Sequence, residues 1–366
     1  MNVILEKEYK HLLEQIRDPN RRSWIFLNAA SIGDTATNCA IAQAFVKEHG
    51  HAITLVVPPD HLPIAQMYPN RFLRTHTAER GLVNMIANKY LNPLRFEIDV
   101  PIYPHPYVAG DCRLHDLQYL SKYPGRGGMT QTDMIRHLLR LPWDAQYERP
   151  TVPAQWDAEA EEIARQIGMP KGESVILFPA NNSPHPQFPD VFWETVAARL
   201  TQRGLKVFCN MRGGTYRPNT MPIAGTTPID VQMHQGLSLV NYAGRIVSSA
   251  TGMQLLVLMG GRFKQMTVTM PISKSVEFQM NQRQYHSTFF MAQYIYPEFL
   301  PGLPFAEFSV PYDGTEQELK DVAIAIADDA FSHPNCVKRM GSNGRTYLEE
   351  HDSWLRKLMA PLPEIS

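Results

Sequence analysis

Short apolar runs alternate with helical patterns in the first part of the chain. Residues 24–27 and 53–57 are apolar runs that predict buried strands. Between them, apolar residues recur at helical spacing over residues 37–49, and Gly50 follows where a helix commonly ends. A strand, a helix and a second strand in this order predict a β-α-β unit with parallel strands and a right-handed crossover.

The same alternation returns in the second half of the chain. Strands are predicted at 174–178, 206–209, 245–248 and 266–269. Helices are predicted at 156–168, 190–203, 253–259, 321–330 and 347–359. Asp190 is the expected N-cap of the second of these helices, and Gly204 is its expected C-cap. Residues 60–150 are rich in Pro, Tyr, His and Arg and show weak periodicity, with 100–104 as either a strand or an extended loop.

Two short turns stand where a predicted strand passes into a predicted helix. The first is Ser31-Ile32-Gly33-Asp34-Thr35 and the second is Ser248-Ser249-Ala250-Thr251-Gly252. A helix that begins after such a turn leaves backbone N–H groups unpaired at the positive end of its dipole, so each turn suits a phosphate or another anion. Two such turns, about half a chain apart, predict two nucleotide-fold domains that face each other across a cleft.

The composition is that of a globular protein with two domains. The 366 residues exceed the usual size of one hydrophobic core, and 44% are hydrophobic while 19% are charged. The formal net charge of −1 argues against a broad nucleic-acid surface, so no nucleic-acid partner is expected. Four scattered cysteines without a C-x-x-C pair favour a reduced, cytoplasmic protein.

Neither a signal peptide nor a membrane span is predicted. The N-terminus is charged and has no apolar segment of the signal-peptide kind. No stretch approaches the roughly 20 apolar residues that cross a bilayer. Peripheral membrane contact stays open, because it needs only a basic or amphipathic face.

Three segments of the chain carry motifs of a known family. Ile32-Gly33-Asp34, with the Ala-rich pattern after it, is similar to a glycine-aspartate turn. Residues 177–192 are similar to an HPGA…K-x-W-P-x-x-x-F segment, and residues 245–261 to an N-D-(T/S)-G-x-x-H segment. Order and spacing agree over residues 23–57 and 173–270. The chain therefore resembles the GT-B glycosyltransferases, nearest to the ADP-heptose:lipopolysaccharide heptosyltransferase family.

The resemblance implies an α/β protein with the GT-B fold, in which two Rossmann-like domains with parallel sheets face an interdomain cleft. It implies an acceptor domain at 1–165, a donor domain at 166–340 and a C-terminal helix at 341–366 that packs back onto the first domain. The implied activity moves a sugar from a nucleotide-diphosphate sugar to a hydroxyl acceptor on a bacterial surface glycan, lipid-linked glycan or protein.

No metal and no separate cofactor are expected. GT-B enzymes typically need no bound metal, which is again what the resemblance implies. The 13 histidines support this, because none forms an H-x-x-x-H or H-E-x-x-H spacing with a convincing carboxylate partner.

Sugar transfer needs a general base near the acceptor hydroxyl, and the resemblance places it at Asp34. The alternative is that Asp34 only caps a helix that starts near Thr35, as Asp commonly does. Gly33 and Thr35 flank it on the acceptor side. Arg113 belongs to a Tyr- and Arg-rich stretch that could grip an acidic acceptor, with an ordinary loop role as the alternative.

The diphosphate needs hydrogen-bond donors aimed at it. Thr251 and Gly252, with Ser249 nearby, match the donor turn of the family. The alternative is an ordinary polar turn that joins two core elements. Three further candidates follow predicted strands at the edge where open α/β sheets bind ligands, namely Arg212, Asn181 and His185. For these the alternatives are a solvated loop arginine and a proline-stiffened surface loop.

Three positions depart from the family pattern. Ala250 stands at its donor-site aspartate, Leu255 at its histidine and Pro186 at its phosphate-facing lysine. These departures support a second hypothesis, a non-catalytic GT-B-like protein that binds a nucleotide or a partner. The retained Asp34 and Thr251-Gly252 oppose it. A third hypothesis is another sugar-nucleotide enzyme, such as an epimerase or hydrolase, which would require further carboxylates and a histidine at the cleft.

Overall fold

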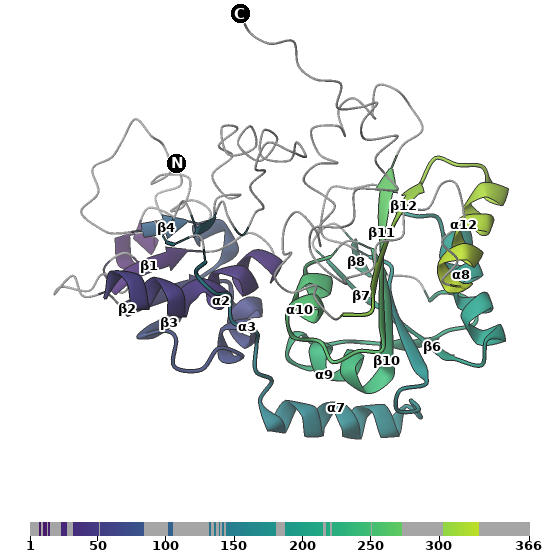
Figure 1. Ribbon diagram of the computed structural model, residues 1–366, viewed down its shortest axis with the longest axis horizontal. Coiled ribbons are helices and arrows are strands. Elements are labelled where there is room, and N and C mark those ends of the chain that lie inside the picture. The colour runs from purple at the N-terminus through teal and green to yellow at the C-terminus, as the bar shows by residue number, and fades with distance from the viewer. Residues whose placement is uncertain are drawn as a thin grey trace, which may run out of the picture.

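Two parallel β-sheets, one in each half of the chain, form the frame of the protein, here a computed structural model (Figure 1). The structure describes residues 7–8, 10–12, 14, 23–27, 32–50, 52–83, 102–104, 132, 135–136, 139, 141–142, 144–180, 187–214, 217–219, 222–249, 251–272 and 303–328. The α/β class and the parallel sheets predicted from the alternating pattern are confirmed.

The first sheet has the strand order β3-β2-β1-β4, and all its pairs are parallel. Its strands are β1 (Ser23–Leu27), β2 (Ala52–Val57), β3 (Arg74–Thr77) and β4 (Ile102–Pro104). Helix α2 (Ile32–His49) connects β1 to β2, and the 3-10 helix η1 (Pro59–His61) and α3 (Leu62–Gln66) follow β2. The predicted β-α-β unit is confirmed, with a helix that begins five residues before the expected start of the pattern.

The second sheet has the strand order β12-β11-β10-β5-β6-β9 and is also parallel throughout. Its strands are β5 (Ser174–Phe178), β6 (Lys206–Asn210), β9 (Thr227–Ile229), β10 (Gly244–Ser249), β11 (Gln265–Ile272) and β12 (Phe305–Pro311). The helices of this half are α8 (Asp190–Gln202), α9 (Met233–Ala243), α10 (Gly252–Gly260) and α12 (Glu316–Asp328). A short antiparallel pair, β7 (Arg212–Gly214) with β8 (Arg217–Asn219), lies beyond β6.

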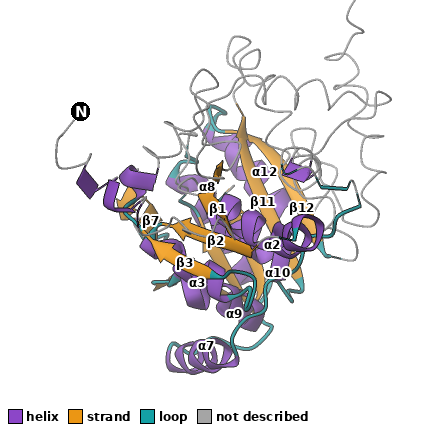
Figure 2. Cartoon of the chain, turned by 90° about the vertical axis from the view of Figure 1, so that its left-hand side faces the viewer, coloured by secondary structure: helices purple, strands orange, loops and turns teal. Residues whose placement is uncertain are grey.

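Helix α7 (Ala154–Gln166) leads from the first half of the chain into the second. It packs on α9 and lies below both sheets in Figures 1 and 2. Ala160 and Ala164 form its buried stripe, as the helical spacing predicted. The predicted division of the chain at residue 165 falls at the end of this helix.

The predicted N-cap of α8 and the predicted start of α12 are wrong. Helix α8 takes Pro189 as its N-cap, so Asp190 is the first helical residue, where its charge still favours the helix dipole. Helix α12 begins at Glu316, five residues earlier than predicted, because Thr315 and Glu318 form reciprocal capping bonds of 2.7 and 3.3 Å. The helices predicted over 347–359 and 341–366 lie outside the described residues.

One hydrophobic cluster continues from the first half of the chain into the second. It joins Phe26 and Ile41 to Leu255, Val257 and residues around them, all of which are buried. Helix α10 is apolar on every side apart from Gln254, which is the pattern of a helix enclosed by protein. It contacts both α2 and α9, so the described parts of the two halves meet along α10.

Candidate functional site

The carboxyl ends of β5 and β10 lie side by side, with Ser248 paired to Phe178. After β5 the chain adds β6 and β9 on one side of the sheet, and after β10 it adds β11 and β12 on the other side. Such a reversal is a topological switch point, and open α/β sheets bind ligands beyond the carboxyl ends of the strands there. Ser249 and Thr251 lie at this point, directly after β10.

The hydroxyl of Ser249 faces the protein interior. The side chain is buried, and its Oγ donates a 3.0 Å hydrogen bond to the carbonyl oxygen of Pro179, which follows β5. Ser249 therefore ties together the ends of the two strands that form the switch point. This bond uses the hydroxyl proton, and the role of Ser249 as a donor-binding residue stays a prediction.

Thr251 is the N-cap of α10, with φ −132° and ψ 162°. Its Oγ1 accepts a hydrogen bond from the backbone N–H of Gln254 at 3.2 Å, and the Oε1 of Gln254 accepts one from the N–H of Thr251 at 3.3 Å. This reciprocal pair is a capping box. The N–H groups of Gly252 and Met253 remain outside the intrahelical bonding pattern, as helix geometry requires at the first turn.

The start of α10 lies against the start of α2. A Cβ atom added at Gly252 would stand 2.7 Å from Ile32 Cβ, 3.2 Å from the Ile32 nitrogen and 3.3 Å from the Gly33 nitrogen. Only glycine permits this approach. Residues 33 and 252, from the two turns that stand out in the sequence, thus come together although they lie in different halves of the chain.

Asp34 is the third residue of α2, and its side chain lies outside the described part of the structure. Because the helix begins at Ile32, the interpretation of Asp34 as the cap of a helix starting near Thr35 is wrong. Asp34 lies inside the first turn instead. Its role as a base stays a prediction.

The hydroxyl of Thr35 bonds within the protein, and its acceptor-side role stays a prediction. It is fully buried, and its Oγ1 lies 2.7 Å from Nδ1 of His61, which is also buried. Arg80 Nη2 lies 3.0 Å from His61 Nε2. A guanidinium can only donate, so Nε2 accepts, and the imidazole proton sits on Nδ1 and is donated to Thr35. Thr35 therefore anchors the first turn of α2 to η1.

Arg212 follows β6 at the same carboxyl edge as the switch point, one strand beyond β5. It forms a two-pronged ion pair with Asp230, with Nε–Oδ1 at 2.7 Å and Nη2–Oδ2 at 3.1 Å. The hydrogen bond from Arg212 lowers the pKa of Asp230, and Gln232 adds a bond of 2.9 Å. The guanidinium is half-exposed, so it is held in place and still faces solvent.

Several predicted positions fall outside the described residues. These are Asn181, His185 and Arg113 among the candidate site residues, and Pro186 and Ala250 among the departures from the family pattern. Within the part of the chain that is described, no group of three or more His, Cys, Asp or Glu side chains could hold a metal ion. The absence of a resident metal or cofactor stays a prediction. No helix in that same part is long and apolar enough to cross a membrane.

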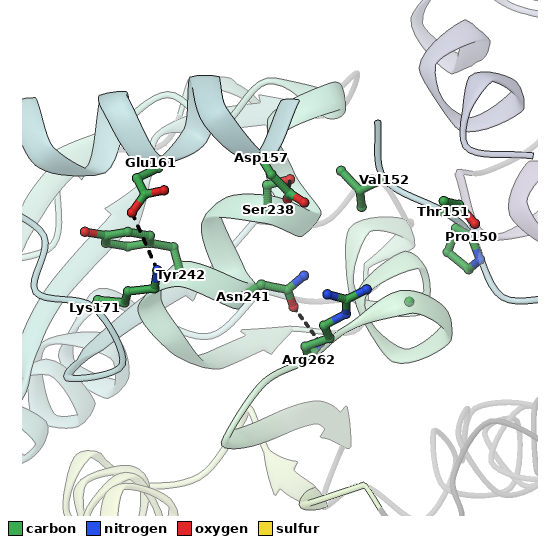
Figure 3. Close-up of a pocket in the computed structure, with 11 residues that line it drawn as sticks. Pro150, Thr151, Val152, Asp157, Glu161, Lys171, Ser238, Asn241, Tyr242 and Arg262 are labelled. Carbon is green, nitrogen blue, oxygen red and sulfur yellow. Dashed lines mark hydrogen bonds and ion pairs between the residues drawn. The ribbon is translucent and has the colours of Figure 1, made fainter. Parts of the chain in front are cut away.

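A separate pocket of about 390 Å³ lies at the opposite, amino edge of the second sheet (Figure 3). It reaches Gly260, the last residue of α10, about 12 Å along the helix from its first residue. Three of its charged groups have partners: Ser238 donates to Asp157 at 2.7 Å, and Lys171 lies 3.5 Å from Glu161. The pocket is thus distinct from the switch point and contains none of the predicted site residues.

Two residues near the helix starts were missed in the sequence. Gln254 had a recognisable signal, because Thr251-x-x-Gln254 is a capping-box pattern before an apolar helix. His61 had none, since its partner Thr35 lies 26 residues away and a single histidine after two prolines resembles an ordinary loop residue.

The geometry defines a class of fold, in which two parallel α/β sheets meet with their switch-point helices in contact. This is the GT-B fold, and two solved structures share it. They are a glycosyl transferase family 9 protein from Veillonella parvula (TM-score 0.53, 13% identity, covering 86% of this chain and 98% of that one) and E. coli ADP-heptose LPS heptosyltransferase II (TM-score 0.51, 12% identity, 84% and 99%). The sequence matches no protein-family model and no curated protein. The resemblance seen in the sequence is thus confirmed at the level of the fold.

Proposed function

We propose that this protein is a glycosyltransferase that moves a sugar from a nucleotide-diphosphate sugar to a hydroxyl acceptor. One observation carries the proposal: the start of α10, at the switch point of the second sheet, meets the start of α2, which carries Asp34. In the GT-B likeness, that meeting point is where a donor diphosphate and an acceptor hydroxyl would come together. The family 9 and heptosyltransferase neighbours share this fold over more than four-fifths of the chain.

The reaction requires one bond to break and one to form at the anomeric carbon. The bond between this carbon and the diphosphate oxygen breaks, and the electron pair leaves with the diphosphate. The acceptor oxygen bonds to the same carbon, and its proton passes to the carboxylate of Asp34 as general base. Backbone N–H groups at the start of α10 stabilise the charge that develops on the diphosphate.

The acceptor is a hydroxyl of a bacterial surface glycan, a lipid-linked glycan or a protein. If the acceptor is lipid-linked, the enzyme works in peripheral contact with a membrane. Arg113 is the acceptor-side residue that we assign to acidic groups of such a substrate, because a guanidinium binds carboxylates and phosphates in two-pronged fashion.

A second candidate function is favoured by Leu255. This residue, at the position of the family histidine, packs against Gly33 as part of the hydrophobic cluster and offers no polar group. A non-catalytic protein that binds a nucleotide or a partner through the same fold would tolerate that substitution. The two candidates differ in whether a bound donor is consumed.

The first experiment is a thermal-shift panel with ADP, GDP, UDP, CDP and TDP. A ligand that binds only the folded protein stabilises it by about 2.7 kcal/mol when its concentration is one hundred times its Kd. The nucleoside diphosphate with the matching base should therefore raise the melting temperature most. That base names the donor class. If none of the five diphosphates raises the melting temperature, the glycosyltransferase proposal is wrong.

The second experiment compares the wild type with Asp34→Asn. The amide has nearly the same shape and cannot accept the acceptor proton, so transfer should fall by roughly 10²- to 10⁴-fold while donor binding persists. Unchanged turnover would remove Asp34 from the mechanism. A wild type that binds a nucleoside diphosphate but transfers no sugar from the matching donor favours the non-catalytic candidate.

A further inference from the structure

The pocket at the amino edge of the second sheet lies beside the linker between the two halves of the chain. Its walls are α7, α9, the linker residues 150–152 and the end of α10 (Figure 3). The backbone N–H of Thr151 donates to the carbonyl oxygen of Met67 at 2.8 Å, and Arg149 Nη1 donates to that of Met259 at 2.9 Å. The linker is therefore fastened to both halves. The volume of about 390 Å³ is within the range of small-molecule sites.

One end of the pocket is filled by its own side chains. Lys171 lies 3.5 Å from Glu161, and its Nζ stands 5.3 Å from the centre of the Tyr242 ring. These three residues satisfy one another through an ion pair and a cation–π contact. The bonding capacity that remains is nearer the linker (Figure 3).

Asp157 and Arg262 each keep a charge that a ligand can meet. Oδ1 of Asp157 accepts from Ser238 at 2.7 Å, which leaves Oδ2 available. The guanidinium of Arg262 has no hydrogen-bond or ion-pair partner within the described ranges, and the two side chains form no ion pair with each other there. Asp157 comes from α7 and Arg262 from the segment after α10, so they approach the pocket from opposite sides (Figure 3). Two opposite charges thus line one pocket without neutralising each other.

Asn241 adds amide donors beside Arg262. Its Oδ1 accepts a hydrogen bond from the backbone N–H of Arg262 at 2.6 Å. This bond orients the amide and leaves its NH₂ group to donate. A guanidinium binds a carboxylate in two-pronged fashion, and an amide donor beside it adds a further bond. This side of the pocket therefore suits a carboxylate, while the available oxygen of Asp157 suits an ammonium group.

The linker supplies an apolar wall. Pro150 is buried and Val152 is half-buried. A Cβ atom added at Gly260 would stand 2.5 Å from Pro150 Cγ, so this wall is packed closely on the last turn of α10. An apolar group of a ligand would remove further apolar surface from water at Pro150 and Val152, which favours binding.

The surrounding charges restrict the ligand. A molecule with only a negative charge would meet Asp157, Glu161 and the negative end of the α10 dipole. A molecule with only a positive charge would meet Arg262. A molecule that carries both charges finds a partner for each of them.

We propose that this pocket binds a free α-amino acid with an apolar side chain. The ammonium group of the ligand is held by Asp157, and its carboxylate is held by Arg262 and Asn241. The side chain of the ligand lies against Pro150 and Val152. This site is separate from the candidate site at the other end of α10, and it goes beyond the proposed function.

Binding is measured by calorimetry on the full chain with leucine, valine and phenylalanine. We expect one ligand per chain, with one of the three amino acids bound most tightly. That amino acid is then compared with its deaminated and decarboxylated analogues, which for leucine are 4-methylpentanoate and 3-methylbutylamine. Each analogue should bind roughly 10- to 100-fold more weakly, since each loses a charge-assisted hydrogen bond.

Two variants assign the two ends of the ligand. Asp157→Asn keeps the acceptor for Ser238 and loses the charge, so it should weaken the amino acid about tenfold and spare the deaminated analogue. Arg262→Gln should weaken the amino acid to a similar degree and spare the decarboxylated analogue. The matched controls are Asp190→Asn, in the first turn of α8 as Asp157 is in that of α7, and Arg74→Gln at an exposed position of β3. Neither control residue lines the pocket, so neither should change binding.

The inference is overturned if none of the three amino acids binds the wild type, or if both pocket variants bind as tightly as the wild type. It is also overturned if a variant weakens the amino acid and both analogues equally, because the charge would then play no part. The inference is supported if each variant spares the analogue that lacks its partner. These measurements involve neither a nucleotide nor a sugar, so their failure leaves the proposed function standing, and a failed nucleotide panel leaves this inference standing.

Discussion

Gly33 of α2 lies against Leu255 of α10 so closely that a Cβ atom added at Gly33 would overlap Leu255 Cδ1 and stand 3.2 Å from Leu255 Cβ. The two residues are 222 positions apart, and their helices follow strands of different sheets. Both are buried, and Leu255 belongs to the hydrophobic cluster that runs through both halves of the chain. At this point the halves are joined by apolar packing rather than separated by solvent.

Gly33→Ala should destabilise the protein by about 1–3 kcal/mol, because a methyl group must enter a filled space in a packed core. The helix itself would favour alanine, so a loss of stability isolates the contact with Leu255. Leu255→Ala opens the space and should cost about 2–5 kcal/mol alone. In chemical denaturation, the free energy of unfolding of the double variant should exceed by about 1 kcal/mol the value predicted by adding the two single effects.

Gly81→Ala is the matched control for this cycle. A Cβ atom at Gly81 would meet nothing within 4 Å, so the substitution should leave stability unchanged or slightly raised. Equal effects of Gly33→Ala and Gly81→Ala, or strictly additive effects of Gly33→Ala and Leu255→Ala, would contradict the packing of α2 on α10.

Thr35→Val tests the anchor of the first turn of α2. Valine keeps the shape of threonine and removes the oxygen that accepts from His61 Nδ1, so we expect a loss of about 1–3 kcal/mol in the free energy of unfolding. Thr35→Ser keeps the oxygen and should lose less, about 1 kcal/mol for one buried methyl group. If valine were as stable as the wild type, the hydrogen bond to His61 would contribute nothing.

The strands and the long helices could be predicted because each is encoded by a local pattern. Residues 174–178 form β5 as predicted, and the strands at 24–27, 206–209 and 266–269 are longer in the structure by one to four residues. Helix α9 was missed, although its buried face is apolar at helical spacing, because its N-cap Gln232 forms no side-chain capping bond and so gives no start signal. The predicted start of α12 was wrong because the capping pattern at Thr315 was overlooked.

The candidate site was predictable as a pair of turns and not as a set of contacts. Glycine-containing turns after apolar strands identify helix starts, which is a local feature. Which side chains face inward depends on tertiary partners: Ser249 bonds to Pro179, and Thr35 bonds to His61. Partners 70 and 26 residues away leave no local pattern, so the sequence could not show these two hydrogen bonds.

The Arg212–Asp230 pair predicts a pH dependence of stability. The hydrogen bond from Arg212 lowers the pKa of Asp230 in the folded state, so the pair stabilises the protein above the unfolded pKa of about 3.9 and is lost as pH falls through the lower folded pKa. Both side chains are about half-exposed, so solvent screening limits the effect at pH 7 to less than about 1 kcal/mol.

Asp230→Asn, which mimics the protonated carboxyl, measures this contribution. In urea denaturation the wild type should exceed the variant at pH 7, and the difference should shrink towards zero as the pH is lowered below about 4. A difference that grows on acidification would mean that Asp230 is stabilised by something other than the Arg212 charge. Adding salt should also reduce the difference at pH 7, since an exposed pair is screened.

Cys39 and Cys209 allow the unfolding of each half of the chain to be followed separately. Cys39 lies in α2 and Cys209 in β6, both are buried, and burial raises the pKa of both thiols, that of Cys209 to about 11. At pH 8 a thiol of pKa 11 is ionised in roughly one molecule per thousand, so neither should react with a thiolate-directed reagent in the folded protein. With Cys112 and Cys336 replaced by serine, labelling should therefore require unfolding.

Mass spectrometry of the labelled peptides in increasing urea then tests the shared core. Both cysteines should become reactive at the same urea concentration, because the hydrophobic cluster at the α2–α10 contact joins the halves. Labelling of one cysteine well before the other would show instead that the two sheets unfold independently and that this contact couples them weakly.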